Sequence, residues 1–484
     1  MSKPKSLTKN FIYNLLYQIL ILVIPLVSTP YISRVLGAEN IGIYSFTLSI
    51  ATYFVLFGTL GTSTYGQREV AYVAHDKEKY SKTFWEIFIL KLGTMTFSLL
   101  TFFLFFVLGN SEYNIYYAIL TIEIVGSLLD ISWLFQGLEE FKKTVLRNAI
   151  IRLVGFALLF VLVKTPADLP IYFAIHVAST FFGNFSLWFY LPKFLSKVNF
   201  KSLNPLKHLK NTIVLFIPQV AIQVYTVLDK TMIGAIITDK SEVGYYEQSQ
   251  KLVKVLLAVV TSLGIVMASR IAKYYAAGKK RETEKAMYKS FRVVFLMGMP
   301  IMAGLMVTAP TFSPLFYGEG YDAIPLLLRI ISPILIFIGM SNVIGIQYLL
   351  PTKKQTEYTA SVISGAAVNF IANLILIPKL GAVGASIGTV IAELTTTAAQ
   401  LYFIRKDFQI SKILFSSFIY IFASIVMVAV CLLIGNFATV PFYKLIAQVV
   451  VGALSYGLVL VIFREPLILE FISKIKSKLR NSNN

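Results

Sequence analysis

The residues that could do chemistry are polar side chains spaced along one face of otherwise apolar segments. Residues 219, 223, 226 and 230 follow the i, i+4, i+7, i+11 rhythm, so a helix would place them on one side. Three such stripes occur: Gln219, Gln223, Thr226 and Lys230; Thr389, Glu393, Thr396 and Gln400; and Asn10, Asn14 and Gln18. Amides, hydroxyls and a cation on one face suit a water-filled cleft that binds a polar, anionic ligand.

Ionisable side chains also lie within apolar segments, where a charge at a helix centre costs about 2.5–3.5 kcal/mol on insertion scales. Such residues tend to face protein or water and to mark functional positions. We expect a substrate-binding set of Lys230, Arg152, Arg329, Arg34, Gln18, Gln219 and Gln223. The candidates for ion coupling are Asp130, Asp229, Glu393, Glu123 and His176.

Each of these residues also has a structural interpretation. Asp229 and Lys230 could neutralise each other, and Arg152 could extend to the membrane surface, as we expect for Lys91. His176 could form a hydrogen bond in helix packing, and the amide and hydroxyl stripes could join helices. Gly384 and Gly388, four residues apart, predict close helix packing without chemistry.

The composition requires that these residues sit in a membrane. The chain has 484 residues, of which 56% are hydrophobic and 14% charged, and a formal net charge of +20. Soluble domains carry about 25% charged residues, so a soluble enzyme is excluded. Its one cysteine, Cys431, excludes a disulfide framework and a thiolate zinc site. P-loop, zinc-protease and nucleophile-elbow motifs are missing from the sequence, so we predict neither an enzyme nor a resident metal or cofactor.

Apolar windows of about 20 residues predict fourteen transmembrane helices. Nine windows are free of charge, beginning with 10–33 and 40–67, and five more are short or interrupted, at about 113–135, 148–165, 211–237, 250–267 and 381–402. With both termini in the cytoplasm, 33 of the 44 Lys and Arg fall in inner loops, as the positive-inside rule requires. The basic charge therefore indicates topology and contact with membrane lipids, not nucleic-acid binding.

A weak repeat divides the chain. Gly42 and Tyr44, after the first span, align with Gly244 and Tyr246, after the seventh, at an offset of 202 residues. Two six-span units of the same orientation would be related by an axis along the membrane normal. We predict an amino-terminal lobe with a basic linker at 1–210, a second lobe at 211–411, and two further helices with a basic tail at 412–484.

Several segments resemble flippases of the Wzx type, which move lipid-linked oligosaccharides and belong to the polysaccharide transporter family of the MATE-like MOP superfamily. The resemblance is carried by Pro30 to Gly37, Leu60-Gly61 with Arg68-Glu69, Asp229 to Tyr246, and Pro378 to Gly388. It implies an all-α polytopic protein with two six-helix lobes in a V-shaped arrangement, plus two carboxy-terminal helices. It also implies alternating access around a central cavity.

The resemblance further implies a function. The expected substrate is a polyprenyl-diphosphate-linked repeat unit, carried from the inner to the outer leaflet of a bacterial plasma membrane for capsule or exopolysaccharide synthesis. Polymerases and glycosyltransferases of the same pathway are the expected partners, and coupling to Na⁺, H⁺ or the membrane potential stays open.

The rival interpretations are a cation-coupled multidrug exporter, a lipid II flippase and a membrane glycan polymerase or ligase. Lipid II flippases have several arginines in their first two spans, which are uncharged here. Short outer loops leave little room for an extracellular catalytic domain.

Overall fold

The computed structural model describes residues 7–262, 264–437, 439–470 and 473, and these form helices and connecting turns without a strand. Eight of the described helices are long and apolar enough to cross a membrane, or nine if the bent pair at 241–276 is one span. Two of the eight have about 50 residues and contain a sharp internal break, so each supplies two of the predicted spans. The protein is therefore an all-α, multi-pass membrane protein, compatible with the predicted fourteen segments.

The chain forms two compact units, Met1–Gly244 and Tyr245–Asn484. The longer helices of the first unit are α1 (Leu7–Thr59), α2 (Thr62–Tyr72), α3 (Lys77–Phe102, extended by the π-helical η1, Phe103–Val107), α4 (Asn114–Leu128), α5 (Ser132–Gly137), α6 (Phe141–Leu162), α7 (Leu169–Phe185) and α9 (Leu209–Ile236). Short elements connect them: η2 (Pro166–Asp168), η3 (Ser186–Tyr190), α8 (Leu191–Phe194), η4 (Phe200–Ser202) and η5 (Pro205–His208).

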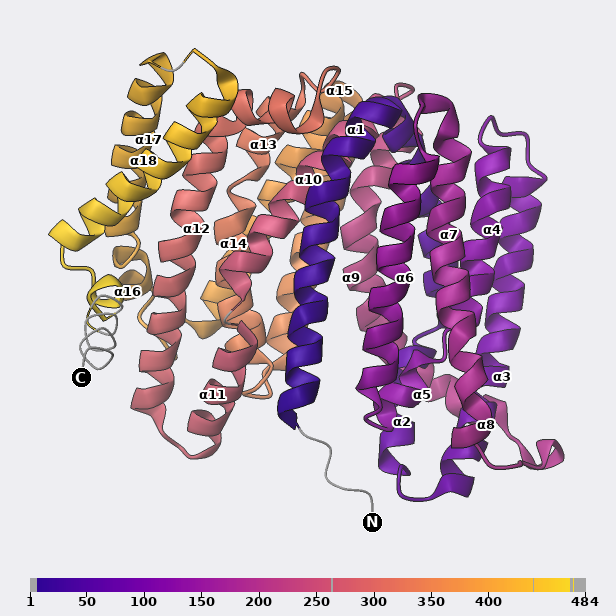
Figure 1. The fold of residues 1–484 in the computed structure, drawn as a ribbon. Coiled ribbons are helices and arrows are strands. Elements are labelled where there is room, and N and C mark those ends of the chain that lie inside the picture. The colour runs from indigo at the N-terminus through magenta and orange to yellow at the C-terminus, as the bar shows by residue number, and fades with distance from the viewer. Residues whose placement is uncertain (1–6, 263, 438, 471–472, 474–484) are drawn as a thin grey trace, which may run out of the picture. The chain divides into compact units, whose positions relative to one another are not determined.

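Within this unit α1 is the central element, because α3, α4, α6 and α9 all pack against it, and α4 also packs against α7. Gly37 has φ 76°, which breaks α1 into two segments that correspond to the first two predicted spans. Figure 1 shows the bend at the upper end of this helix. A residue with a side chain rarely adopts this φ, so glycine is needed at the turn.

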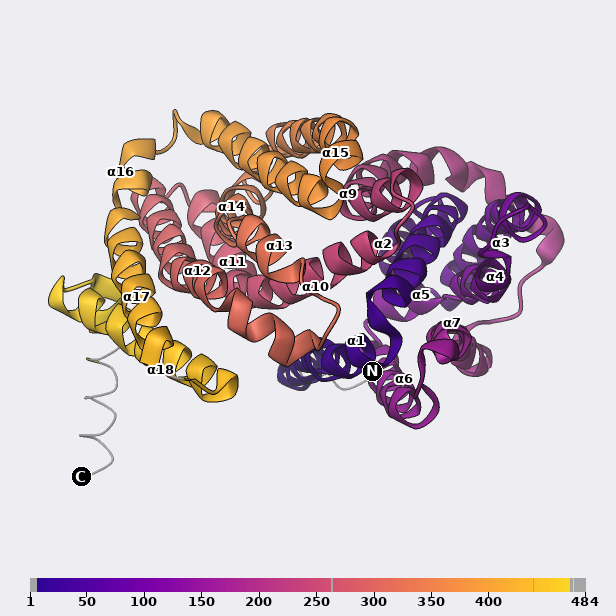
Figure 2. The same ribbon diagram turned by 90° about the horizontal axis from the view of Figure 1, so that it is seen from above.

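The second unit starts within α10 (Ser241–Thr261). It continues through α11 (Gly264–Ala276), α12 (Lys280–Tyr317), α13 (Ile324–Ile331), α14 (Ile334–Ser341), η6 (Asn342–Leu349), α15 (Gln355–Ile404), α16 (Ile410–Phe415), α17 (Phe418–Phe437) and α18 (Pro441–Ile462). Helices α17 and α18 lie beside each other and against α12, as Figure 2 shows from above. They are the two appended spans of the prediction.

A second break, at Gly381 with φ 55°, divides α15 into two segments that fold back on each other. A Cβ atom on Gly384 would lie 2.4 Å from the carbonyl oxygen of Leu376, and one on Gly388 would lie 2.4 Å from Oδ1 of Asn373. The close packing predicted from the spacing of these two glycines is therefore confirmed.

Candidate functional site

The polar face predicted on α9 is joined to its neighbours in the first unit by hydroxyl and amide contacts. Gln219 donates from Nε2 to Oγ1 of Thr64 on α2, at 2.7 Å. Farther along α9, Oγ1 of Thr231 lies 2.8 Å from Oγ of Ser49 and 3.3 Å from the hydroxyl of Tyr53, both on α1. Consecutive helix residues are about 100° apart around the axis, so Thr231 and its hydroxyl contacts lie on a side of α9 next to the stripe that carries Lys230.

Two ionisable residues lie on α9 immediately before Thr231. The side chain of Asp229 is buried and that of Lys230 is half-buried. Gln223, two turns before Lys230, is half-buried, and its carbonyl oxygen accepts a hydrogen bond from Thr226. The side chain of Gln18 on α1 lies outside the part of the chain that the structure describes. Lys230 is therefore a half-buried cation on the same face of α9 as Gln219, Gln223 and Thr226, as the binding of an anionic group would require.

A second group of the predicted residues comes together from α4, α6 and α7. Nε2 of His176 on α7 lies 3.7 Å from Oε2 of Glu123 on α4. The positive charge of Arg152 on α6 also acts on His176, and the ring of Tyr44 packs edge-on against the imidazole at 5.8 Å. The distance of 3.7 Å is an ion-pair distance and exceeds that of a hydrogen bond.

The remaining basic candidates, Arg34 and Arg329, are exposed at helix ends. Arg34 donates to the carbonyl oxygen of Pro30, and Arg329 to that of Met306, each at 3.0 Å. Arg34 belongs to the first unit and Arg329 to the second.

The stripe on the second segment of α15 is buried within the second unit. Oγ1 of Thr389 lies 2.9 Å from the hydroxyl oxygen of Tyr246. The same hydroxyl oxygen accepts a hydrogen bond from Nε2 of Gln250, at 2.7 Å. Thr396 packs against Gly365 of the first segment. A Cβ atom on Gly365 would lie 2.0 Å from Oγ1 of Thr396. Glu393, between them, is only 8% exposed. These contacts fit the alternative interpretation of this stripe, in which polar side chains hold helices together.

The expectation that Lys91 extends to the membrane surface is wrong. Its side chain is fully buried, and Nζ donates to the carbonyl oxygens of Ser127, at 2.7 Å, and Asp130, at 2.9 Å. These carbonyls lie at the break between α4 and α5, where the helical hydrogen bonds are interrupted. Oδ1 of Asp130 accepts a hydrogen bond from the backbone N–H of Ser132, the first residue of α5, at 2.9 Å. Asp130 and Lys91 therefore stabilise a broken helix.

One buried ionic cluster was not predicted. Glu86 on α3 is fully buried and accepts from Nζ of Lys207 at 2.6 Å and from the backbone N–H of Asn204 at 3.0 Å. Nε2 of His208 lies 3.1 Å from the same carboxylate, and Nδ1 lies 2.8 Å from the hydroxyl of Tyr65. The cluster ties the segment that leads into α9 to α2 and α3. Glu86 stands between Trp85 and Ile87, so it is an ionisable residue among apolar neighbours, as Glu123 is. The same criterion could have selected it from the sequence.

Two glycines bring α1 and the start of α10 into direct backbone contact. A Cβ atom on Gly42 would lie 1.7 Å from the carbonyl oxygen of Lys240, and one on Gly244 would lie 2.1 Å from that of Ala38. Gly42 corresponds to Gly244 and Ala38 to Lys240, each at an offset of 202 residues, so the contact is reciprocal between the two copies of the repeat. Burial lowers the pKa of Lys240, whose Nζ donates to the carbonyl oxygens of Gly234 and Ile237 at the end of α9.

The fold and these polar faces define a class: multi-pass helical membrane proteins with ionisable and amide side chains inside the helical units. The sequence profile of the polysaccharide biosynthesis protein family matches residues 7–268, more than half of the chain, and the chain belongs to this family. The profile of the MatE family matches residues 215–378.

Named relatives agree with this assignment. A putative O-antigen transporter of Escherichia coli K12 is 26% identical over 83% of this chain and 97% of its own length. The capsular polysaccharide biosynthesis protein CapF of Staphylococcus aureus is 23% identical over 83% of this chain and all of its own length.

Among solved structures, the inward closed conformation of the lipid II flippase MurJ covers 95% of the chain with a TM-score of 0.74 and 18% identity. An inward-facing multidrug resistance transporter of the MATE family covers 81%, with a TM-score of 0.57 and 14% identity. At these identities the likeness shows the fold alone. The chain therefore has the same overall fold as these two transporters.

Proposed function

We propose that this protein is a flippase that moves polyprenyl-diphosphate-linked oligosaccharide repeat units from the inner to the outer leaflet of a bacterial plasma membrane. The product would be used for capsule or exopolysaccharide assembly. The observation that carries the proposal is the similarity, over almost the whole length of the relative, to a putative O-antigen transporter. Capsule synthesis and glycan flippase activity also appear in the names of two other relatives.

The chemistry of the first unit supports this substrate class. A diphosphate needs a cation, which Lys230 on α9 can supply, with Arg152 on α6 as a further source of positive charge. A neutral glycan needs amide and hydroxyl groups, and Gln219, Gln223 and Thr226 line the same face of α9. We assign transport and no catalytic step to these groups.

The transport step proposed here is alternating access. Such a mechanism needs a contact that closes one side of the membrane and can open again. The reciprocal packing of Gly42 and Gly244 is suited to this, because it joins two backbones without side chains between them. With both termini in the cytoplasm, this contact lies on the outer side.

The test is to delete the gene and measure both surface glycan and the leaflet that holds polyprenyl-linked glycan. We expect surface polymer to be lost and single lipid-linked units to accumulate on the inner leaflet. Accumulation of single units on the outer leaflet would instead indicate a polymerase or ligase. Complementation with the intact chain is the control.

A multidrug exporter is the second candidate, favoured by the MatE profile match at residues 215–378. In that case the deletion strain would become sensitive to cationic drugs and keep its surface glycan. A lipid II flippase is the third candidate, and deletion would then block peptidoglycan synthesis. It is disfavoured by the uncharged first two spans, at 10–33 and 40–67.

A further inference from the structure

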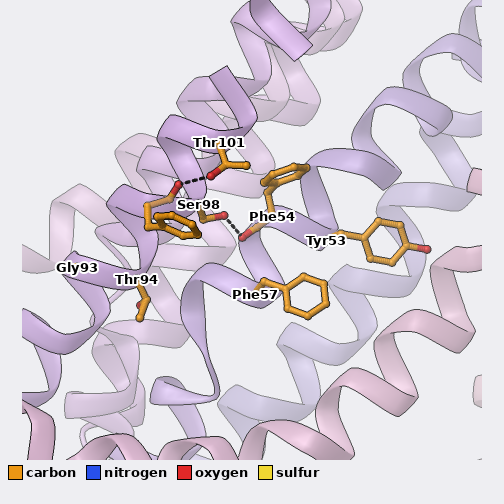
Figure 3. Close-up of a pocket in the computed structure, with 8 residues that line it drawn as sticks. Tyr53, Phe54, Phe57, Gly93, Thr94, Ser98 and Thr101 are labelled. Atoms are coloured by element: carbon orange, nitrogen blue, oxygen red, sulfur yellow. Dashed lines mark hydrogen bonds between the residues drawn. The ribbon is translucent and has the colours of Figure 1, made fainter. Parts of the chain in front are cut away.

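An apolar pocket of about 570 Å³ lies between the second segment of α1 and α3, both in the first unit. Its lining consists of Tyr53, Phe54, Phe57, Gly93, Thr94, Phe97, Ser98 and Thr101 (Figure 3). Pockets that bind small ligands have volumes of about 300–1,000 Å³ and are lined mainly by apolar and aromatic side chains. Phe57 and Phe97 are 53% and 74% exposed, so the pocket opens at their level.

The hydroxyl groups around the pocket are already engaged. Thr94 donates to the carbonyl oxygen of Gly58 and Ser98 to that of Phe54, each at 2.6 Å, while Thr101 donates to that of Phe97 at 2.8 Å. Figure 3 shows the bonds of Ser98 and Thr101. Because these hydroxyls serve the helix backbones, the pocket offers a ligand hydrocarbon contacts and no polar recognition.

One side of the pocket is held open by a glycine. A Cβ atom on Gly93 would meet no atom within 4 Å. By contrast, one on Gly58 of the facing helix would lie 2.5 Å from Sδ of Met95, where α1 and α3 are in close contact. The two helices therefore touch at Gly58 and separate beside Gly93.

The fourth hydroxyl connects the pocket to the proposed substrate face. The hydroxyl of Tyr53 lies 3.3 Å from Oγ1 of Thr231 on α9, which also contacts Ser49 and lies about 100° around the helix from Lys230. Ser49 and Tyr53 lie within the uncharged window 40–67, ten and six residues before α1 ends at Thr59. An ordinary membrane lipid keeps its polar head group at the surface, whereas a lipid-linked substrate in transit brings its diphosphate through the interior.

We propose that this pocket binds the isoprenoid chain of the lipid-linked substrate, in the part closest to the diphosphate, while the head group contacts the α9 face. This inference rests on the proposed function and adds a hydrocarbon-binding site to it. The substrate would then be held at both its charged and its apolar part, and the chain would stay in an apolar environment while the head group crosses the membrane.

The test is photo-crosslinking of the purified full-length protein in lipid nanodiscs. The probe is a short polyprenyl diphosphate that carries a benzophenone on its isoprenoid chain near the diphosphate. We expect labelled peptides to contain residues 53–57 and 93–101, and labelling to be displaced by unlabelled polyprenyl diphosphate. Labelling elsewhere, or equal displacement by phosphatidylglycerol, would overturn the proposal, and in the second case the pocket would be an ordinary lipid site.

Gly93→Leu fills the pocket with a side chain where the structure has space. Since each CH₂ group excluded from an apolar site weakens binding several-fold, we expect labelling by the probe to fall at least about tenfold. The matched control is Gly457→Leu on α18, because a Cβ there also meets no atom within 4 Å. Unchanged labelling of a stably folded Gly93→Leu protein would contradict the proposal. The mapping on the wild-type chain decides the question if this variant does not fold.

Cells separate the failure of this inference from the failure of the proposed function. If deletion abolishes glycan export and Gly93→Leu restores it fully, the pocket does not bind the substrate and the function stands. If the probe labels the pocket and deletion leaves export intact, the pocket binds isoprenoid chains and the proposed function is wrong.

Discussion

At the scale of single residues, Lys230 is the side chain that the proposed mechanism needs most. It is half-buried on α9, on the face that also carries Gln219, Gln223 and Thr226. We expect Lys230→Ala to abolish glycan export at normal protein levels, because a diphosphate in a membrane interior needs a compensating charge. Lys230→Arg should keep part of the activity, since it keeps the charge and changes the geometry.

Export is measured as surface glycan in a complemented deletion strain. Lys254→Ala on α10, which removes an exposed lysine, is the matched control. Full export by the Lys230→Ala variant would remove this residue from the mechanism.

Glu86 gives a second prediction at this scale, on stability. Breaking a buried ion pair by removing one partner costs about 3–5 kcal/mol. Lys207 is 47% exposed, so solvent screening reduces its share, while His208 is buried against the same carboxylate. We expect Glu86→Gln to lower the melting temperature of the purified protein, because the amide cannot balance the charge of Lys207.

Glu69→Gln is the control for this variant. Its ion pair with Arg68 is at the surface, where such pairs contribute about 0–1 kcal/mol. Equal melting temperatures for the two variants would show that the Glu86 cluster contributes no more to stability than a surface pair.

At the scale of elements, the contact of Gly42 with Lys240 and of Gly244 with Ala38 leads to a prediction about gating. A methyl group at either glycine would overlap a carbonyl oxygen, at 1.7 and 2.1 Å. Because overlaps of this size force the backbones apart, Gly42→Ala and Gly244→Ala should each disfavour the state described here and reduce export.

The opening can be measured directly with a cysteine at position 38, in a chain whose native Cys431 is replaced by serine. Ala38 is 8% exposed, so a membrane-impermeant maleimide should react slowly with this cysteine. Adding Gly42→Ala should speed the reaction, while Gly93→Ala, at an open position of α3, should not. Equal reaction rates in all three proteins would show that the contact does not control access.

The membrane-spanning helices could largely be predicted from the sequence, whereas several contacts between them could not. Spans bounded by charges, such as 40–67, were found because apolar length alone determines whether a segment can cross a membrane. The correspondence of Gly42 with Gly244 was visible as a weak repeat, although their contact was not predicted. The burial of Lys91 was not predictable, because it depends on carbonyl groups freed by the α4–α5 break, 36 to 39 residues away. The pocket beside Gly93 was also missed, since a space between two helices has no sequence pattern of its own.

Sequence could select the residues of the candidate site, but it could not predict their grouping in space. Glu123, His176 and Lys230 were each selected because an ionisable side chain in an apolar segment costs free energy of insertion. In the structure, Glu123 and His176 lie close to each other. Their grouping depends on which helices are neighbours, and apolar sequence does not specify that. Asp130 illustrates the limit, because its contact with the backbone N–H of Ser132 could not be predicted from its position in an apolar segment.

At the scale of the whole molecule, the proposed substrate is an anion, and the membrane potential should act on its transport. An inside-negative potential favours outward movement by about 2.3 kcal/mol per charge per 100 mV, which is about fiftyfold in the distribution across the membrane. We expect proteoliposomes that contain the protein and a fluorescent polyprenyl-diphosphate glycan to accumulate it on the positive side when valinomycin imposes a potassium diffusion potential. Vesicles clamped at zero potential should show equal distribution, and vesicles with the Lys230→Ala protein should show slow movement at any potential. The contrary result is accumulation driven by a Na⁺ or pH gradient and not by the potential. The driving force would then be an ion bound by carboxylates such as Asp229, Glu393 or Glu123, and this ion would compensate the charge of the substrate during transport.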